Sequence, residues 1–387
     1  MEGLKNMNTR IAAKSDVNSI REMWENSRGG GIFTQWFFDK VFYSGNSVVT
    51  ETEGDVTSCS CTIPYKLNIN GGELDATYIG AVIANPENRT PDTLNLLMAD
   101  TLSFINSKNS PIAFTVPDNY KFFEKYGFSL CYDYNQYNIT PAELPSFGIN
   151  GTIIRPKTIS KEVIDMLNPV YEKFTRKKNG YAVRSEDDWK LIFDDFYKNF
   201  NGKCVIYKNY RNEILGYMLY IIRDNKMGIY ELAYSKREGY EGLVGFIKSH
   251  EEIISQVSLK MPSDDLLYLN LCDNRMAVSK CPFAMARIID VKTVLQYFAQ
   301  TAPENIRLQV IDRIIEDNNK IFTFSQGDVL AIDDDSNVAT DIGTLTQLVL
   351  GYLSVEEAYA INLIKGDISL LKDVFQKQTT YINMLCV

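Results

Sequence analysis

The stretch VIANPENRTPDTL, residues 82–94, decides the fold of this chain of 387 residues. Its first three residues are apolar and end a strand-like run. Pro86 and Arg89 mark a Pro-x-x-Arg turn, and apolar residues recur at helical spacing after Pro91, which suits a first helical turn. The stretch therefore predicts a strand that leads through a turn into an amphipathic helix.

The residues on either side complete one α+β unit. A helix is predicted around Ile20 and Trp24 with Asp16 as its N-cap, and strand-like runs flank a hairpin signal at residues 70–72. A strand, a short helix and a last strand at residues 132–139 follow the helix that begins at Pro91. This order of helices and antiparallel strands is typical of a single α+β domain.

A second unit follows a linker rich in Pro, Ser and Gly at residues 141–151. It shows strand patterns over residues 204–234, a helix pattern over 240–257 and a strand pattern over 266–271. The order loosely repeats the first unit, although the Pro-x-x-Arg turn does not recur. We interpret the second unit as a degenerate copy that binds no cofactor.

The third unit begins near Cys281. Asp290 is predicted to cap a helix, Ser354 opens a capping box, and another helix is predicted over residues 368–375. The tail after Lys377 carries no charged side chain. Because a frayed terminus is normally polar, we infer that this tail packs into the protein.

Composition narrows the classes of function. The net charge of −9 opposes sequence-independent binding to nucleic acid or anionic lipid, which needs a positive field. The sequence contains no run of about 18 apolar residues and no apolar segment at its start, so we expect a cytoplasmic protein without a membrane span.

The cysteines indicate buried, reduced thiols. Their number is seven, and Cys59 and Cys61 alternate along a strand and are expected to share a face. The single histidine, His250, cannot complete a usual zinc set with them. We therefore expect no metal.

Further motifs give the chain a family resemblance. FFEKYGF at residues 122–128 resembles the element that closes the core of GCN5-related N-acetyltransferases (GNAT proteins), and residues 82–94 resemble their acyl-coenzyme A pocket. GYAVR at residues 180–184 with Trp189, and ARIIDV at residues 286–291, follow in order. Together these motifs resemble the enhanced intracellular survival (Eis) type of N-acetyltransferase over essentially the whole chain.

The resemblance implies an α+β fold with tandem acetyltransferase domains and a sterol-carrier-like domain. The expected boundaries are 1–145, 146–283 and 284–387, with a C-terminal tail that reaches the active site. It also implies a homo-oligomer, a trimer or a hexamer of paired trimers. The expected reaction moves acetyl from acetyl-coenzyme A (acetyl-CoA) to an amine of a cationic small molecule or peptide.

The acetyl-CoA site would lie on the opening stretch. Strand edges can pair with the amides of pantetheine, and a helix N-terminus favours the pyrophosphate. The backbone near Val82 would polarise the acetyl carbonyl. The residues implied for binding are Val82, Ile83, Ala84, Arg89, Thr90, Asp92, Thr93 and Leu94.

One residue departs from the family pattern at the pyrophosphate. The pattern asks for glycine where Asp92 stands, and a carboxylate there would repel pyrophosphate by roughly 1 to 4 kcal/mol. The alternative interpretation is that Asp92 caps its helix in a protein that no longer uses coenzyme A.

The residue at the proton-donor position also departs from the family pattern. Phe123 stands where the family has the tyrosine that protonates the thiolate, so Tyr120 and Tyr126 are the substitute candidates, with core packing as the alternative role of each. The resemblance makes the terminal carboxylate, here that of Val387, the base that takes the proton of the amine. A tail that simply fills a groove is the alternative.

The resemblance also implies that an acceptor cavity lies beside the glycine turn at residues 29–31. Phe33 and Trp36 follow it and are the substrate candidates, because aromatic faces attract cations. Ordinary core aromatics are the alternative. The rival interpretation of the whole chain is a catalytically impaired acetyltransferase fold that acts as a ligand-binding or scaffold protein.

Overall fold

The computed structural model describes residues 7–271 and 278–383. The chain forms two compact units that do not follow sequence order. The first unit joins residues up to 131 with residues 283–378. The second joins residues 132–282 with the tail from Thr379 onward. The first and third segments of the sequence thus fold together.

The first unit contains a sheet with the strand order β1-β2-β3-β4-β5-β14. Neighbours are antiparallel, apart from the parallel pair β4 and β5. The bounds are β1 Met7–Ile11, β2 Ser47–Thr52, β3 Asp55–Ile69, β4 Gly72–Ala84, β5 Ile112–Thr115 and β14 Ser279–Ile288.

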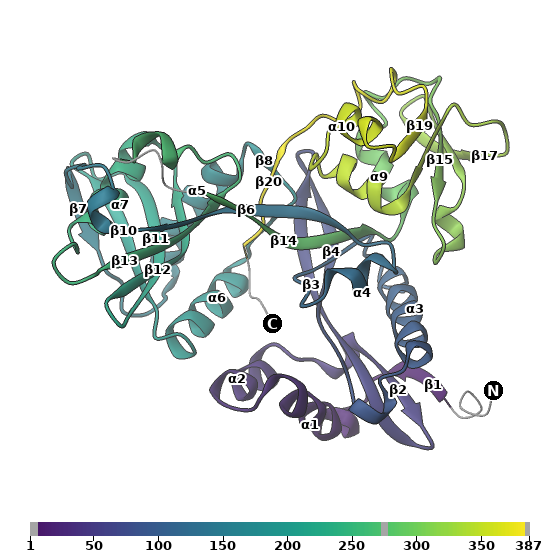
Figure 1. Ribbon diagram of the computed structural model, residues 1–387, viewed down its shortest axis with the longest axis horizontal. Coiled ribbons are helices and arrows are strands. Elements are labelled where there is room, and N and C mark those ends of the chain that lie inside the picture. The colour runs from purple at the N-terminus through teal and green to yellow at the C-terminus, as the bar shows by residue number, and fades with distance from the viewer. Residues whose placement is uncertain (1–6, 272–277, 384–387) are drawn as a thin grey trace. The chain divides into compact units, whose positions relative to one another are not determined.

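The long hairpin of β3 and β4 dominates this sheet (Figure 1). Its turn has φ angles of 51° at Asn70 and 82° at Gly71, the left-handed values that a two-residue hairpin turn requires. This confirms the hairpin predicted at residues 70–72. Cys59 and Cys61 share a face of β3, as expected, with their sulfur atoms 3.8 Å apart.

Three helices of residues 7–131, α1, α3 and α4, were predicted from the sequence, whereas α2 was not. The helix after the turn, α3, begins at Pro91 as expected. Asp16 precedes α1, but its carboxylate binds Arg10 and the Ala13 amide rather than the helix. The bounds are α1 Val17–Arg28, α2 Ile32–Lys40, α3 Pro91–Ser107 and α4 Tyr120–Glu124.

The third segment of the chain forms a five-stranded sheet in the order β17-β16-β15-β18-β19. Asp290 caps α8 and Ser354 opens a capping box on α10, as predicted. Residues 368–375 form turns, so the helix predicted there is wrong. The bounds are β15 Arg307–Ile311, β16 Ile321–Ser325, β17 Asp328–Ile332, β18 Val338–Asp341, β19 Ile364–Gly366, α8 Val291–Leu295, α9 Ile342–Val349 and α10 Val355–Ala360.

A buried ion pair links the third segment of the chain to the FFEKYGF motif at residues 122–128. Arg287 on β14 donates to both carboxylate oxygens of Asp312, at 2.8 and 2.7 Å, and both side chains are fully buried. Its other terminal nitrogen donates to the carbonyl of Tyr126. Gly127 has a φ of 78°, and a Cβ there would overlap the Arg287 guanidinium. The glycine of the FFEKYGF motif is therefore required by Arg287.

The second unit is a sheet with helices on both faces. The strand order is β6-β13-β12-β11-β10-β7. One face packs against α7 and the other against α5 and α6 (Figure 1). The bounds are β6 Ser129–Ile139, β7 Gly151–Ile154, β10 Lys203–Asn209, β11 Ile214–Arg223, β12 Lys226–Tyr234, β13 Gln256–Pro262, α5 Lys161–Thr175, α6 Glu186–Lys198 and α7 Arg237–Lys248.

The structure corrects two predictions in this unit. The helix predicted over residues 240–257 ends at Lys248, and Val257 instead lies in β13, parallel to β12. Residues 266–271 contain a short 3₁₀ turn rather than a strand. Short apolar runs such as Gln256–Pro262 do not distinguish strand from helix by periodicity alone.

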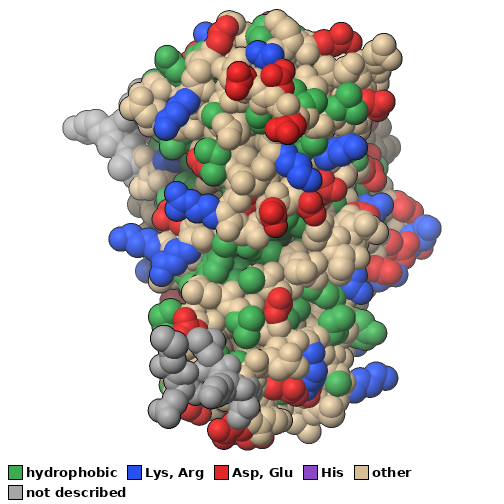
Figure 2. Space-filling view, turned by 90° about the vertical axis from the view of Figure 1, so that its right-hand side faces the viewer, with side chains coloured by type: hydrophobic (Ala, Val, Ile, Leu, Met, Phe, Trp, Pro, Cys, Tyr) green, Lys and Arg blue, Asp and Glu red, His purple; other side chains and the backbone are tan. Residues whose placement is uncertain are grey.

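Charges are mixed on the molecular surface. Over most of the face in Figure 2, acidic and basic side chains lie among one another. Across residues 7–271 and 278–383, no helix is long and apolar enough to cross a membrane. Within the same residues, no three His, Cys, Asp or Glu side chains gather as a metal ion would require.

Candidate functional site

The strand β4 separates from β5 where the sequence predicted a binding edge. The two strands pair only from Ala76 to Tyr78, β5 ends at Thr115, and β4 continues to Ala84. The Thr115 hydroxyl donates to the carbonyl of Ile79 at 2.8 Å, which ends the contact between the strands. Over the described chain, no strand pairs with this edge of β4 beyond Tyr78. Backbone groups near Val82 can therefore meet an extended ligand.

A β-bulge interrupts β4 at the start of this edge. Ile79 pairs with Thr62 and Ala81 with Cys61, so Gly80 is an extra residue between them. A bulge bends its strand and redirects backbone groups, and such features recur beside binding sites. The sequence analysis missed it, although a glycine inside a strand pattern is the signal that indicates a bulge.

The turn after β4 leads directly into α3. A 3₁₀ turn spans Pro86–Asn88, and Thr90 is the N-cap, with its hydroxyl accepting from the Thr93 amide at 3.2 Å. The interpretation of Asp92 as the cap is therefore wrong. Asp92 is exposed in the first helical turn, where the helix dipole favours a negative charge. That charge occupies the place where an anionic ligand would otherwise gain from the same dipole.

Most amides of this turn bind within the turn. The amide of Thr90 donates to the Asn88 carbonyl at 2.8 Å, and that of Leu94 to the Thr90 carbonyl at 3.1 Å. Pro91 has no amide hydrogen. Among the described residues nothing accepts from the amides of Glu87 and Asp92, and the Asp92 amide lies in the first turn of α3, where it can donate to a ligand. The exposed Arg89 side chain adds a positive charge beside it.

The structure brings the closing motif to this end of β4. Val82, Tyr120, Phe123 and Tyr126 all belong to, or pack against, one apolar cluster with Leu97 of α3. Phe123 is 7% exposed, as a packing residue would be. One cofactor candidate, Val82, therefore packs against the same cluster as the two tyrosine candidates.

Both candidate proton donors are hydrogen-bonded to the protein. Tyr126 donates to the Asn95 side-chain oxygen at 2.8 Å, and Tyr120 donates to the Phe283 carbonyl at 3.1 Å. Burial raises the pKa of Tyr126, which keeps its hydroxyl protonated at neutral pH. The sequence analysis missed Asn95, because nothing in a helical pattern tells which neighbouring element faces an asparagine.

The substrate candidates lie on α2 within an aromatic cluster. The ring centroids of Phe33 and Trp36 are 5.8 Å apart, and Phe37 stacks on Trp24 of α1 at 4.5 Å. Trp36 is 6% exposed, whereas Phe33 is half-buried and more accessible. This arrangement favours Phe33 over Trp36 as a residue that a ligand can reach.

The C-terminal tail packs into the second unit, as inferred from its sequence. Thr379 and Thr380, strand β20, pair in parallel with Lys178 and Asn179 of β8. Ile382 is 6% exposed. Val387, the candidate base, lies outside the described residues.

A buried ionic network anchors this tail. Arg184 and Glu231 form a bidentate pair at 2.8 and 3.0 Å, with 2% and 1% of their side chains exposed. The Tyr381 hydroxyl donates to Glu231 at 2.9 Å, and Arg184 donates to the Asn383 carbonyl at 2.8 Å. Although burial by itself lowers the pKa of Arg184, the Glu231 carboxylate raises it above its usual value. A lone glutamate inside the apolar strand Met227–Tyr234 was the sequence signal for this network.

Family models cover most of the chain. Two models of an acetyltransferase (GNAT) domain match residues 8–131 and 180–288, and a model of a sterol carrier protein domain matches residues 291–383. None of the curated proteins matches the sequence. The first match contains the whole edge, turn and closing motif described above.

Solved structures share the complete three-domain fold. Eis1 from Mycobacterium abscessus has a TM-score of 0.79 at 17% identity, covering 97% of this chain and 99% of that chain. The chain has tandem GNAT acetyltransferase domains and a sterol carrier protein domain. A probable N-acyltransferase from Enterococcus faecalis V583 has a TM-score of 0.86 to this chain at 21% identity, covering 97% of this chain and 98% of that chain. At these identities the likeness concerns the fold.

Proposed function

We propose that this tandem GNAT protein transfers acetyl from acetyl-CoA to an amine of a cationic small molecule or peptide. The observation that carries the proposal is the edge of β4 beyond Tyr78, which is unpaired by β5 and runs into the N-terminus of α3. The bulge at Gly80 redirects backbone groups at that edge, where an amide could polarise an acyl carbonyl.

The residues fit the two ends of acetyl-CoA unequally. The free edge near Val82 suits the amide-bearing pantetheine arm. Arg89 and the Asp92 amide suit a pyrophosphate, while the Asp92 carboxylate opposes it. We therefore expect binding that is specific at the acyl end and weak at the pyrophosphate.

The proton steps are assigned to this chain's own groups. The attacking amine must lose a proton, and the Val387 carboxylate is the proposed base, held by a tail that the Arg184–Glu231 pair anchors at Asn383. Tyr126, protonated at neutral pH and a member of the apolar cluster against which Val82 packs, is the proposed acid for the thiolate. Phe33 is the proposed contact for the cationic acceptor. The proposed assembly is a homo-oligomer, a trimer or hexamer, in the cytoplasm.

Isothermal titration with acetyl-CoA tests the proposal. We expect saturable binding with a dissociation constant of about 0.1 to 1 mM, because the Asp92 charge offsets part of the affinity. Release of free thiol in the presence of polyamines then measures turnover. A chain that fails to bind acetyl-CoA at millimolar concentration is not an acetyltransferase.

Truncation tests the proposed base. Deleting Cys386 and Val387 is expected to abolish turnover while leaving acetyl-CoA affinity and the thermal midpoint unchanged. The matched control keeps the chain length and replaces Val387 with alanine, which retains the terminal carboxylate. Unchanged turnover after the deletion would remove that carboxylate from the mechanism.

The rival function is a ligand-binding protein with an impaired acetyltransferase site. The internally bonded amides of Thr90 and Leu94 favour it, because they leave the turn with few free donors for a phosphate. Its signature would be amine binding without any acetyl-CoA binding in the same titrations.

A further inference from the structure

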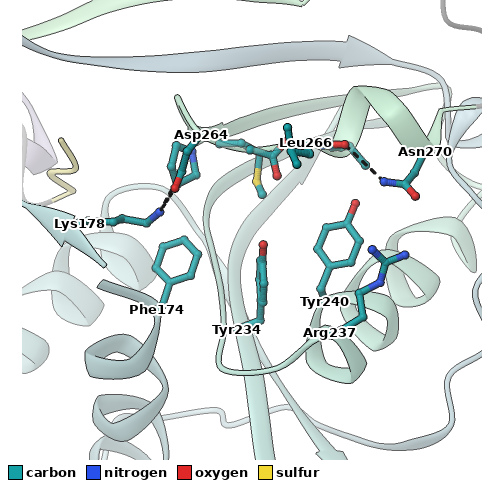
Figure 3. A pocket seen from close by; sticks show the side chains of 12 residues that line it. Phe174, Lys178, Tyr234, Arg237, Tyr240, Asp264, Leu266 and Asn270 are labelled. Atoms are coloured by element: carbon teal, nitrogen blue, oxygen red, sulfur yellow. Dashed lines mark hydrogen bonds and ion pairs between the residues drawn. The ribbon is translucent and has the colours of Figure 1, made fainter. Parts of the chain in front are cut away.

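A pocket of about 290 Å³ lies in the second unit, and none of the residues assigned to acetyl transfer lines it. Its lining comes from α5, β8, β12, α7, β13 and the segment after β13. In Figure 3 the rings of Phe174, Tyr234 and Tyr240 stand in a row below Asp264 and Leu266. Adjacent ring centroids are 5.6 Å apart for Phe174 and Tyr234, and 5.3 Å for Tyr234 and Tyr240.

Both basic side chains at the pocket already have acidic partners. The Lys178 ammonium contacts both oxygens of Asp264, at 2.9 and 3.0 Å (Figure 3). The Arg237 guanidinium donates to Glu241 at 2.8 Å. These pairs leave little positive charge for an anionic ligand.

Asp265 is different, because only neutral groups bind it. Its Oδ2 accepts from the Tyr137 hydroxyl at 2.9 Å and from the Leu267 amide at 2.8 Å. Within the described chain, no Lys, Arg or His forms an ion pair with it. The residue is 9% exposed, and burial raises the pKa of its carboxyl. A buried carboxylate without a cation is costly, and a cationic ligand would relieve that cost.

Tyr240 adds an unused polar group to the same wall. It is 5% exposed, and its buried hydroxyl has no hydrogen-bond partner among the described residues. Burial raises the pKa of Tyr240, and the neighbouring Asp265 charge raises it further. An orphaned hydroxyl beside a carboxylate is a pair of acceptors that one ammonium group can satisfy.

We propose that this pocket binds a small organic ammonium ion. Its nitrogen would donate to Asp265 and to the Tyr240 hydroxyl, and its methylene groups would lie against the rings of Phe174 and Tyr234. Aromatic faces attract cations, and the volume suits a short alkylamine rather than a large molecule. The proposal does not rest on the proposed acetyl transfer.

Calorimetry on the full-length protein without acetyl-CoA tests the proposal. The probe is n-butylammonium at pH 7, with butyrate as its charge-reversed counterpart and 1-butanol as its neutral one. We expect a dissociation constant of about 1 mM for butylammonium and at least tenfold weaker binding of the other two. Equal or tighter binding of butyrate would overturn the proposal, as would no binding of butylammonium.

Variants locate the binding. Asp265→Asn keeps an acceptor for Tyr137 but removes the charge, and we expect at least a tenfold loss of butylammonium affinity. Asp195→Asn is the matched control, because Asp195 is 8% exposed in the same unit and burial also raises its pKa. The butylammonium affinity of the Asp195→Asn variant is expected to stay unchanged.

A second variant decides the question if Asp265→Asn fails to fold. Tyr234→Leu removes one aromatic wall and keeps the carboxylate, and we expect about a threefold loss, because the methylene groups of the ligand lose part of the apolar surface against which they pack. Butylammonium binding that ignores these substitutions would place the amine elsewhere, for example in the acetyltransferase site, and would overturn this assignment without touching the proposed function.

Discussion

At the scale of single residues, two positions carry opposite kinds of constraint. Gly127 is required by packing, because the Arg287 guanidinium and the Ile342 side chain occupy the space where a Cβ would lie. No packing contact requires Asp92, because its side chain is exposed and the N-cap of α3 is Thr90. A substitution at Gly127 therefore tests the stability of the fold, and a substitution at Asp92 tests the affinity for acetyl-CoA.

Gly127→Ala is expected to lower the stability of the first unit by about 3 kcal/mol or more, from left-handed strain and steric overlap together. The matched control is Gly54→Ala, which has a φ of 96° but open space around it. It should cost only about 1 kcal/mol, the strain alone. Denaturant midpoints of both variants measure the difference. Equal losses of stability in the two variants would show that the Arg287 side chain moves away from the new Cβ at no energetic cost.

Asp92→Asn is expected to tighten acetyl-CoA binding about fivefold, and Asp92→Gly similarly, because the repulsion between the carboxylate and the pyrophosphate is removed. The gain should shrink as ionic strength rises, since the site is exposed. Titration at low and high salt measures both effects. A variant that binds no tighter would show that Asp92 points away from the pyrophosphate.

At the scale of elements, the tail is the segment whose position matters most to the proposed function. Strand β20 holds it through two residues, and Tyr381 and Asn383 add contacts to a fully buried ion pair. Phe174 lies between the tail and the ammonium pocket, with its ring 5.5 Å from that of Tyr381 and 5.6 Å from that of Tyr234. Tail docking and the pocket thus share a wall.

Tyr381→Phe is expected to loosen the tail by about 1.5 to 3 kcal/mol, because a hydrogen bond to a buried charged group is lost while the ring remains. Hydrogen exchange of the peptide that contains residues 379–383 should accelerate at least tenfold. Tyr359→Phe on α10, where the ring is 48% exposed, is the control and should leave that exchange unchanged. Unaltered exchange in Tyr381→Phe would show that β20 alone holds the tail.

At the scale of the whole molecule, the sterol carrier domain packs with the first acetyltransferase domain. Asp312 receives Arg287, and it also accepts from the amides of Ile314 and Ile315 and from Asn318. Burial lowers the pKa of Arg287, and Asp312 counters that effect. One saturated carboxylate thus fixes the guanidinium that supports the Tyr126–Gly127 turn.

Asp312→Ala is expected to destabilise the first unit by about 3 to 5 kcal/mol, since it strands a buried guanidinium. The double variant Arg287→Met with Asp312→Ala should recover part of that loss, because no buried charge remains. Denaturant unfolding of the two single variants and the double variant completes the cycle. A double variant whose loss equals the sum of the single losses would show that the pair does not act as a unit.

The sequence by itself determined the local structure that short-range chemistry controls. Residues within a few positions of one another specify three kinds of local feature. These are the start of α3 at Pro91, the hairpin turn at Asn70 and Gly71, and the helix caps at Asp290 and Ser354. The order of motifs also predicted two acetyltransferase domains and a sterol carrier domain, which the family models confirm.

Only the tertiary structure decided which distant groups meet. It paired Tyr126 with Asn95, placed Arg287 beneath Gly127, closed the Arg184–Glu231 network over the tail and gathered the ammonium pocket. It also ended α7 at Lys248, where pattern alone extended the helix. The physical reason is that burial and pairing energies depend on neighbours from remote segments, which no local spacing of residues encodes.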